Sequence, residues 1–184
     1  MARQFSADDP ERMKWQNPGD ILMSIGLKPG MIFVDVGCGD GFFALPAARI
    51  VGPQGNVIAA DIDAGAVARL KEAVQREELR NLSASVKPAE ELIACDHCAD
   101  IVFFGIDLHD FSDPEQVIAN AGKMLKAGGL LIDLDWKNEP MKHGPPQWKR
   151  FSPEKARGMI VSGGFRIRSI TDAGQYHYLI IAEN

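Results

Sequence analysis

Short apolar runs alternate with segments of helical periodicity along this 184-residue chain. The segments between the runs place apolar residues three or four positions apart, which predicts helices with one buried face. Strands that alternate with helices in this way form a parallel sheet covered on both sides. The expected strands are residues 31–36, 57–60, 82–86, 101–104 and 130–134, and the expected helices are residues 18–25, 42–51, 64–78, 114–127 and 153–162.

The last two of these helices have clear boundary signals. Residues 113–116 (DPEQ) and 152–153 (SP) have the types that cap a helix and occupy its first position. Glycine pairs at 128–129 and 163–164 follow the last apolar positions of the same two helices. Paired glycines at such positions are expected to end each helix.

The C-terminus departs from the alternation. Two further strands, residues 165–170 and 176–182, are joined by only the segment TDAGQ. This connection is too short for a crossover helix, so the two strands must pair antiparallel as a hairpin. We therefore expect a mostly parallel sheet that closes in an antiparallel C-terminal hairpin.

The most informative segment is VDVGCGDGFF, residues 34–43, where a strand leads into a glycine-rich turn and then a helix. Glycines allow positive φ and a close approach to a ligand, and the helix N-terminus presents free N–H groups. A dinucleotide-binding turn reads G-x-G-x-x-G, but this chain has Phe42 where the third glycine is required. Gly37, Gly39 and Gly41 therefore predict a nucleotide-like cofactor other than NAD.

With Asp35 two residues before its first glycine, the turn resembles motif I of the class I S-adenosylmethionine-dependent methyltransferases. Residues 55–63, 99–111, 124–136 and 162–169 resemble, in order, later parts of the same family's fold. The resemblance covers nearly the whole chain and is closest to the small ubiquinone/menaquinone-type, or type 11-like, branch. It implies a Rossmann-like three-layer α/β sandwich around a seven-stranded, mostly parallel sheet of order 3-2-1-4-5-7-6.

The resemblance makes S-adenosylmethionine the expected cofactor, and Asp35 is expected to orient its methionine part. Asp61 lies twenty residues after Gly41, the usual offset for an acidic residue that accepts hydrogen bonds from ribose hydroxyls. Asp63 is expected to cap the helix that follows. The other expected cofactor contacts are Gly37, Cys38, Gly39, Gly41, Ile62, Ala89, Glu90 and Gly105.

The expected contact with adenine differs from the family pattern. Pro88 stands where the family usually has an aspartate, so a side-chain hydrogen bond from that position is absent. The carboxylate of Glu90 is a candidate substitute, and a solvated carboxylate is an equally good interpretation. The backbone at Ala89 is the preferred contact.

Residues after the fourth and fifth strands are candidates for the acceptor side, because ligands of open α/β sheets bind at the carboxyl ends of strands. Asp107 and His109 follow strand four, and Asp135 follows strand five. His109 is interpreted either as a general base, since an unperturbed histidine pKa of about 6.5 suits proton removal, or as a surface-loop histidine. These three residues are the catalytic candidates.

Residues 136–151 form a long Pro-rich connection without an evident helix or strand. Such connections are often functional lids. Trp136, His143 and Arg150 are expected to contact the acceptor, with Trp148 beside them. From the N-terminal extension, residues 1–17, Trp15 and Phe5 are expected to close the site from the other side.

Composition predicts one domain, residues 1–184, since 46% of the residues are hydrophobic and 24% are charged. The N-terminus has no apolar run, and no stretch approaches the roughly 20 apolar residues that span a bilayer, so we expect a cytoplasmic protein without membrane insertion.

Charge is distributed unevenly along the chain: residues 88–122 have eight acidic and no Lys or Arg residues, and residues 137–168 have eight basic and two acidic residues. This pattern indicates either two solvated faces or a basic flap that attracts an anionic substrate. The overall net charge of −5 makes nucleic acid a minor candidate.

Cys95 and Cys98 flank His97 in a C-x-x-C arrangement. Structural zinc sites need a second ligand pair, and Cys38 is committed to the glycine turn, so no metal is expected. An odd count of three cysteines also argues against a disulfide framework. We interpret the pair as ordinary loop cysteines, with a thiol-dependent acceptor such as a metalloid as the minority alternative.

These features together predict a methyltransferase that uses S-adenosylmethionine and methylates a small-molecule acceptor by direct displacement. One alternative is a methyltransferase that acts on RNA or a protein side chain. The other is a catalytically silent cofactor-binding domain. The sequence leaves the acceptor atom and the oligomeric state open.

Overall fold

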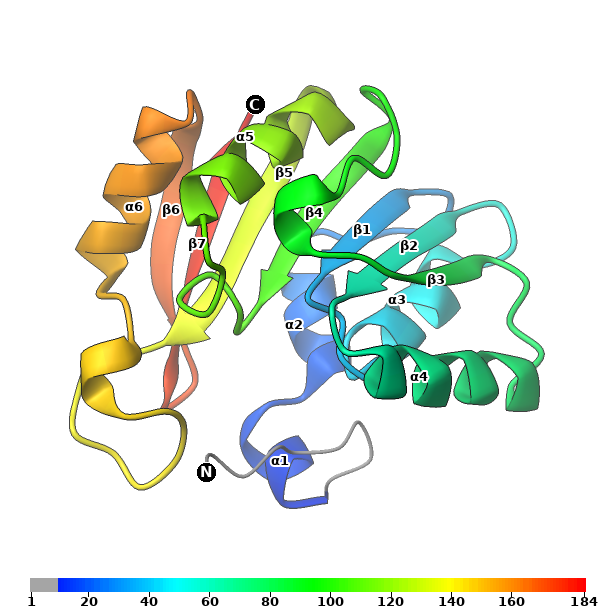
Figure 1. Ribbon diagram of the computed structural model, residues 1–184, viewed down its shortest axis with the longest axis horizontal. Helices are drawn as coiled ribbons and strands as arrows, with labels where there is room; N and C mark the ends of the chain where they lie inside the picture. The colour runs from blue at the N-terminus through cyan, green and yellow to red at the C-terminus, as the bar shows by residue number, and fades with distance from the viewer. Residues whose placement is uncertain (1–9) are drawn as a thin grey trace.

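The computed structural model describes residues 10–184, and its seven strands form one sheet (Figure 1). The strand order is β3-β2-β1-β4-β5-β7-β6. All neighbouring pairs are parallel except those of β7, which runs antiparallel to both β5 and β6. The predicted order and the C-terminal hairpin are therefore confirmed. The strands are β1 (Ile32–Val36), β2 (Asn56–Asp61), β3 (Leu82–Val86), β4 (Ala99–Gly105), β5 (Leu125–Trp136), β6 (Arg166–Ala173) and β7 (His177–Glu183).

Helices cover both faces of the sheet and make three layers (Figure 1). Phe33 and Phe103 point to one face and pack with α2, α3 and α4, whereas Val34 and Phe104 point to the other and pack with α5 and α6. This alternation follows from the two-residue period of a strand. The helices are α1 (Pro10–Trp15), α2 (Pro18–Ser24), α3 (Ala44–Val51), α4 (Ala64–Arg76), α5 (Pro114–Met124) and α6 (Pro153–Ser162), with single 3₁₀ turns η1 (Ala89–Glu91) and η2 (Gln147–Lys149). Across residues 10–184, every helix is too short or too polar to span a membrane.

The predicted starts of α4, α5 and α6 are confirmed by their caps, whereas the helix predicted from residue 42 begins only at Ala44 and has no side-chain cap. The Asp113 side chain accepts the Gln116 N–H at 3.0 Å, and the Ser152 hydroxyl accepts the Lys155 N–H at 3.2 Å. Asp63 caps α4 as expected, with its Oδ1 accepting the Gly65 N–H at 2.7 Å. Each bond satisfies a donor that the helix itself leaves without a partner.

The expectation that Gly128 and Gly129 end α5 is wrong. The helix ends at Met124, and the next residue already pairs with β4. The ladder then resumes only at Leu130, so the residues between them form an irregularity within β5. Gly128 has φ of +74°, and a Cβ on Gly129 would lie 2.9 Å from the Lys126 carbonyl oxygen. The glycines therefore serve a tight bend inside the strand.

Two segments that lacked a sequence signal are ordered around one end of the sheet. The N-terminal extension contains α1, and the connection expected to be without structure contains η2. Figure 1 shows α1 and the connection after β5 beyond the edge where β1, β2, β4 and β5 end. Trp136, the last residue of β5, pairs there with His177, the first residue of β7.

Candidate active site

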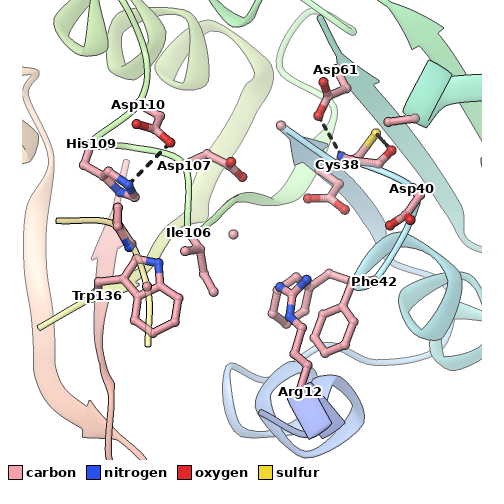
Figure 2. A pocket seen from close by; sticks show the side chains of 18 of the residues that line it. Arg12, Cys38, Asp40, Phe42, Asp61, Ile106, Asp107, His109, Asp110 and Trp136 are labelled. Carbon is pink, nitrogen blue, oxygen red and sulfur yellow. Dashed lines mark hydrogen bonds and ion pairs between the residues drawn. The ribbon is translucent and has the colours of Figure 1, made fainter. Parts of the chain in front are cut away.

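A cavity of about 740 Å³ lies at the carboxyl ends of the parallel strands. The loops after β1, β2, β4 and β5 form its walls, and α1 closes one side (Figure 2). Its volume falls within the roughly 300–1,000 Å³ of small-molecule sites. The position agrees with the rule that open parallel sheets bind ligands where their strands end.

The glycine turn after β1 needs each of its three glycines for a separate reason. Gly37, Gly39 and Gly41 have φ of +80°, +52° and +100°, a region that residues with a Cβ rarely adopt. A Cβ on Gly37 would lie 2.7 Å from the Asp107 Cγ, and one on Gly41 would lie 2.5 Å from the Leu70 Cδ1. A Cβ on Gly39 would meet no atom within 4 Å, so this residue faces open cavity. At Gly37 and Gly41 the turn therefore allows neighbouring side chains to pack closely against the backbone, and at Gly39 it exposes the backbone to the cavity.

Asp61, the last residue of β2, ties the glycine turn to the neighbouring strand. Its Oδ2 accepts the Gly39 N–H at 2.7 Å, and its Oδ1 accepts the Asp63 N–H at 2.8 Å. An ionised carboxylate has about four acceptor positions, so these two bonds leave others for ligand hydroxyls. Because Asp61 lines the cavity, it can bind a ligand while it holds the turn.

The wall below the turn is strongly acidic. Asp35 is 1% exposed, and its Oδ2 makes no hydrogen bond within the described residues. Burial raises the pKa of Asp35 to about 7 and the charge of Asp61 adds to this, against opposing effects of Arg12 and the Ala44 N–H. Burial likewise raises the pKa of Asp107 well above its ordinary value, with the charge of Asp35 contributing. A wall of this kind favours a positively charged ligand.

Cys38 lies within the same wall and is chemically quiet. Burial, with the negative charges of Asp35, Asp61 and Asp107, raises the pKa of its thiol far above the ordinary range. A thiol rather than a thiolate is therefore present at neutral pH. Because the thiolate is the nucleophile, Cys38 contributes shape and backbone to the site.

On the opposite wall, His109 and Asp135 form a hydrogen-bonded pair. The His109 Nδ1 lies 2.8 Å from the Asp135 Oδ1, and the same carboxylate accepts the backbone N–H groups of His109 and Trp136. The His109 side chain is 2% exposed, so the interpretation as a surface-loop histidine is wrong. Asp135 is fully buried behind the imidazole and does not line the cavity.

The pair also changes how His109 binds protons. Burial by itself lowers the pKa of His109, but the hydrogen bond and charge of Asp135, with a contribution from Asp110, raise it above the ordinary value. The His109 Nε2 lies 3.5 Å from the Asp110 Oδ2. A dashed line marks this interaction in Figure 2. The imidazole is thus held in place and made more basic, which suits acceptance of a proton from a ligand.

An aromatic cluster completes the acceptor side. Trp15 on α1 stacks on His143 and on His177, with ring centroids 6.1 and 5.6 Å apart. Trp136 lies 5.8 Å from Trp15 and 4.3 Å from His177. Burial lowers the pKa of His177 to about 3, so its ring is neutral and packs as an aromatic group. Three of the four predicted acceptor residues, Trp15, Trp136 and His143, therefore lie together at the cavity.

The fourth, Arg150, does not line the cavity, so its expected contact with the acceptor stays a prediction that this geometry does not favour. Its buried guanidinium donates to four backbone carbonyls, with distances from 2.8 to 3.3 Å. The acceptors are the carbonyls of Lys137, Glu139, His143 and Pro145. Arg150 therefore holds the loop that brings His143 to the cavity. Trp148 is 81% exposed and does not line the cavity.

Three of the expected cofactor contacts, Ile62, Ala89 and Glu90, lie outside the cavity lining. Glu90 Oε1 accepts the N–H groups of Ser112 and Asp113 at 2.9 and 3.2 Å, so its carboxylate already organises the start of α5. Ala89 begins η1, and Ile62 is 73% exposed after β2. By contrast, Gly105 lines the cavity at the end of β4.

Several lining residues had no usable sequence signal. Arg12 lies in an extension that was expected to contribute only aromatic residues, yet it enters the cavity from α1 (Figure 2). Phe42 and Phe43 line the cavity where the glycine pattern drew attention to spacing alone. Ile106 has φ of +75°, a strained backbone for a β-branched residue, and it faces the cavity after Gly105. Phe5 lies outside the described residues.

The C-x-x-C segment lies at the other end of the sheet. Cys95 and Cys98, interpreted from the sequence as ordinary loop cysteines, form a disulfide just before β4 begins. The cavity lies where β4 ends, so these sulfurs lie at the opposite end of that strand from the site. Within residues 10–184, no group of three or more His, Cys, Asp or Glu side chains could hold a metal ion.

The sheet order, the glycine turn and the acidic end of β2 define the class I methyltransferase fold. A family model described as a methyltransferase domain matches residues 27–173, and the chain belongs to this family. A solved S-adenosylmethionine-dependent methyltransferase from Aquifex aeolicus is 27% identical, with a TM-score of 0.91 over 98% of this chain and 99% of its own. A type 11 methyltransferase structure from Sulfolobus solfataricus, 24% identical with a TM-score of 0.73, covers 92% of each chain and shares the fold.

Curated relatives place the chain near the ubiquinone/menaquinone branch. A demethylmenaquinone methyltransferase of Listeria welshimeri is 28% identical over 138 residues, which is 75% of this chain. A ubiquinone/menaquinone biosynthesis C-methyltransferase of Vibrio campbellii is 32% identical over 117 residues, or 60% of this chain. The matched regions cover 56% and 43% of these two relatives, so the chain spans about half of their length.

Proposed function

We propose that this protein binds S-adenosylmethionine and transfers its methyl group to a small, planar acceptor. The observation that carries the proposal is one cavity with two chemically different walls. The glycine turn and the acidic cluster form one wall, and His109, held by Asp135 behind it, forms the other with the Trp15 and Trp136 rings. Cofactor and acceptor would thus share a single enclosed space.

The cofactor wall fits S-adenosylmethionine by charge and by shape. The cofactor carries positive charge on its sulfonium and ammonium groups, and Asp35 and Asp107 each have a buried oxygen without a hydrogen-bond partner in the described part of the chain. Asp61 has spare acceptor positions for ribose hydroxyls. Gly39 leaves the backbone bare where a side chain would otherwise project into the cavity. Acidic and backbone groups therefore match the ligand's donors and cations.

When bound, the cofactor supplies an activated methyl group with a good leaving group. The task left to the chain is alignment of the acceptor, which is worth several powers of ten in rate. Trp15, Trp136 and His143 would hold a flat acceptor by stacking, and Ile106 would limit its depth. His109 would take a proton at Nε2 when the acceptor is a hydroxyl or an acidic carbon, while Asp135 keeps its Nδ1–H oriented.

The acceptor class follows from the aromatic wall together with the relatives. Aromatic rings favour flat, polarisable ligands through offset or edge-to-face packing. The Listeria and Vibrio relatives are named for menaquinone and ubiquinone biosynthesis. We infer that this chain methylates a quinol-type or related hydroxyaromatic small molecule.

Two measurements test the proposal. Calorimetry should show binding of S-adenosylmethionine and of S-adenosylhomocysteine but no binding of NAD. Incubation with methyl-labelled cofactor and a panel of hydroxyaromatic compounds should transfer label, and the Gly39→Val variant, which fills the open face of the turn, should lose both binding and transfer. Tight binding of NAD without binding of either sulfur cofactor would exclude the proposed activity, and cofactor binding without transfer to any small molecule would indicate a silent cofactor-binding domain.

A further inference from the structure

The cavity contains charged side chains of both signs. The acidic groups Asp35, Asp61 and Asp107 come from the strand ends, whereas a cation, Arg12, enters from α1. Figure 2 shows the Arg12 side chain rising from the helix into the cavity, with Phe42 on one side and Ile106 on the other. An arginine that faces a buried acidic wall in a ligand cavity requires a functional explanation.

The guanidinium is held in a defined orientation. Its Cζ lies 3.6 Å from the centroid of the Phe42 ring, a cation–π contact, and 5.9 Å from that of Phe43. Its Nε donates to the Oε1 of buried Gln16 at 2.7 Å. Stacking on one face and a hydrogen bond at one edge fix the direction of the planar group before a ligand arrives, which reduces the entropy lost on binding.

The charge of Arg12 acts on the carboxyl groups of the acidic wall. Its charge lowers the pKa of both Asp35 and Asp107, although burial dominates and leaves both values raised. Arg69 and Lys142 also line the cavity, but their charges are not among the main causes of the pKa shifts of these two carboxyls. Arg69 lies 3.9 Å from Asp40, and Lys142 belongs to the loop that carries His143. Of the lining cations in the described chain, Arg12 is therefore the one whose charge acts most strongly on Asp35.

Building on the proposed function, we propose that Arg12 binds the α-carboxylate of the cofactor's methionine part while Asp35 faces the adjacent ammonium group. The methionine part has one negative and one positive group on the same carbon, and the cavity offers one fixed cation across from a buried carboxyl. A guanidinium and a carboxylate can form two parallel charge-assisted hydrogen bonds, which gives orientation as well as affinity.

This assignment makes α1 part of the cofactor site. Trp15 lies three residues after Arg12, so the two side chains share a face of the helix. The helix that contacts the cofactor carboxylate therefore also supplies a ring of the acceptor wall. Cofactor binding would hold α1 in place and complete the acceptor side, which favours binding of the cofactor before the acceptor.

The test compares two ligands that differ only in the carboxylate. Dissociation constants for S-adenosylmethionine and for its decarboxylated analogue are measured by calorimetry on the wild type, Arg12→Gln and Arg12→Lys. Arg12→Gln should weaken S-adenosylmethionine binding roughly 10- to 100-fold, the scale of hydrogen bonds to a charged group, and change binding of the analogue by less than about twofold. Arg12→Lys should give an intermediate loss because it keeps the charge without the planar fork.

Lys14→Gln is the matched control, because it removes the same charge from the same helix at an exposed position outside the cavity lining. It should leave both dissociation constants unchanged. Equal losses of affinity for the two ligands in Arg12→Gln would overturn the assignment and indicate that Arg12 only supports α1. An unchanged affinity for S-adenosylmethionine, or an effect confined to the acceptor KM, would overturn it too. Absence of S-adenosylmethionine binding in the wild type would instead reject the proposed function.

Discussion

His109 and Asp135 lie 26 residues apart in the chain, and a hydrogen bond of 2.8 Å joins the Nδ1 of one to the Oδ1 of the other. Two backbone N–H groups hold the same carboxylate in place. With Nδ1 committed to Asp135, Nε2 is the nitrogen left to accept a proton. The pair therefore has the geometry of a general base and the group that orients it.

Removal of the imidazole should slow the reaction without weakening the binding of the cofactor. We expect His109→Gln to lower kcat by about 10²–10⁴-fold with an acceptor that must lose a proton, the usual range for general base catalysis. The dissociation constant for S-adenosylhomocysteine should stay unchanged. Steady-state kinetics and calorimetry on the same preparation provide the two values. A fall in cofactor affinity equal to the fall in kcat would contradict the separation of the two walls.

The same pair predicts a pH profile. Burial lowers the pKa of His109, but the hydrogen bond and charge of Asp135 outweigh it and raise the pKa above 6.5. Wild-type kcat/KM should therefore rise with pH through a midpoint above that value. In Asp135→Asn the lowering effect of burial persists without the opposing carboxylate, so the midpoint should move to lower pH. A midpoint that does not move would show that His109 is not the titrating base.

Cofactor affinity should depend on the ionisation of Asp35. A cationic ligand stabilises the ionised carboxylate, whose pKa is about 7 in the structure because of burial and then Asp61. Deprotonation therefore favours binding, and the dissociation constant should fall by up to about tenfold per pH unit from about pH 5.5 to 7, then level off. Asp35→Asn should bind more weakly and lose most of this dependence. Calorimetry in two buffers of different ionisation enthalpy would also detect the proton released by the wild type.

The role found for Arg150 gives a prediction opposite to that for an acceptor contact. Arg150→Lys cannot satisfy the four carbonyls that the guanidinium bonds, and each buried group left without a partner costs about 1–3 kcal/mol. We expect a lower free energy of unfolding and a raised acceptor KM, because the loop with His143 loosens. Cofactor affinity should remain unchanged. If stability is unaffected while KM for anionic acceptors alone rises, Arg150 contacts the acceptor after all.

Asp133 should reduce the stability of the fold at neutral pH. It is fully buried, and neither of its oxygens makes a hydrogen bond of good geometry in residues 10–184. Burial, followed by the charge of Asp135, raises its pKa well above 3.8, against a smaller lowering effect of the neighbouring Tyr178 hydroxyl. The unfolded chain therefore loses a proton that the folded chain keeps, and the resulting penalty grows as pH rises above 3.8. Asp133→Leu should increase the free energy of unfolding by about 1–3 kcal/mol at neutral pH. In chemical denaturation, this gain in the free energy of unfolding should vanish at about pH 4. A gain that does not depend on pH would indicate better packing of the leucine instead.

Most of the sheet could be predicted because each strand and helix has a local cause. The run Ile32–Val36, the cap at Asp113 and the short TDAGQ connection each determine their element from nearby residues. Errors arose where neighbours in space overrode local preference. The bend at Gly129 exists because the chain passes the carbonyl oxygens of Lys126 and Ala99, which no local pattern reveals.

The features of the site also differ in whether nearby residues or the tertiary structure determine them. The sequence by itself determined the glycine turn, the acidic end of β2 and the location of the cavity, because the spacing of glycines and the direction of parallel strands fix them. Only the tertiary structure decided that Arg12 enters the cavity, that Arg150 organises a loop and that Asp135 lies behind His109. These roles depend on contacts between residues far apart in the chain, and the direction of a long side chain is set by the groups that surround it after folding.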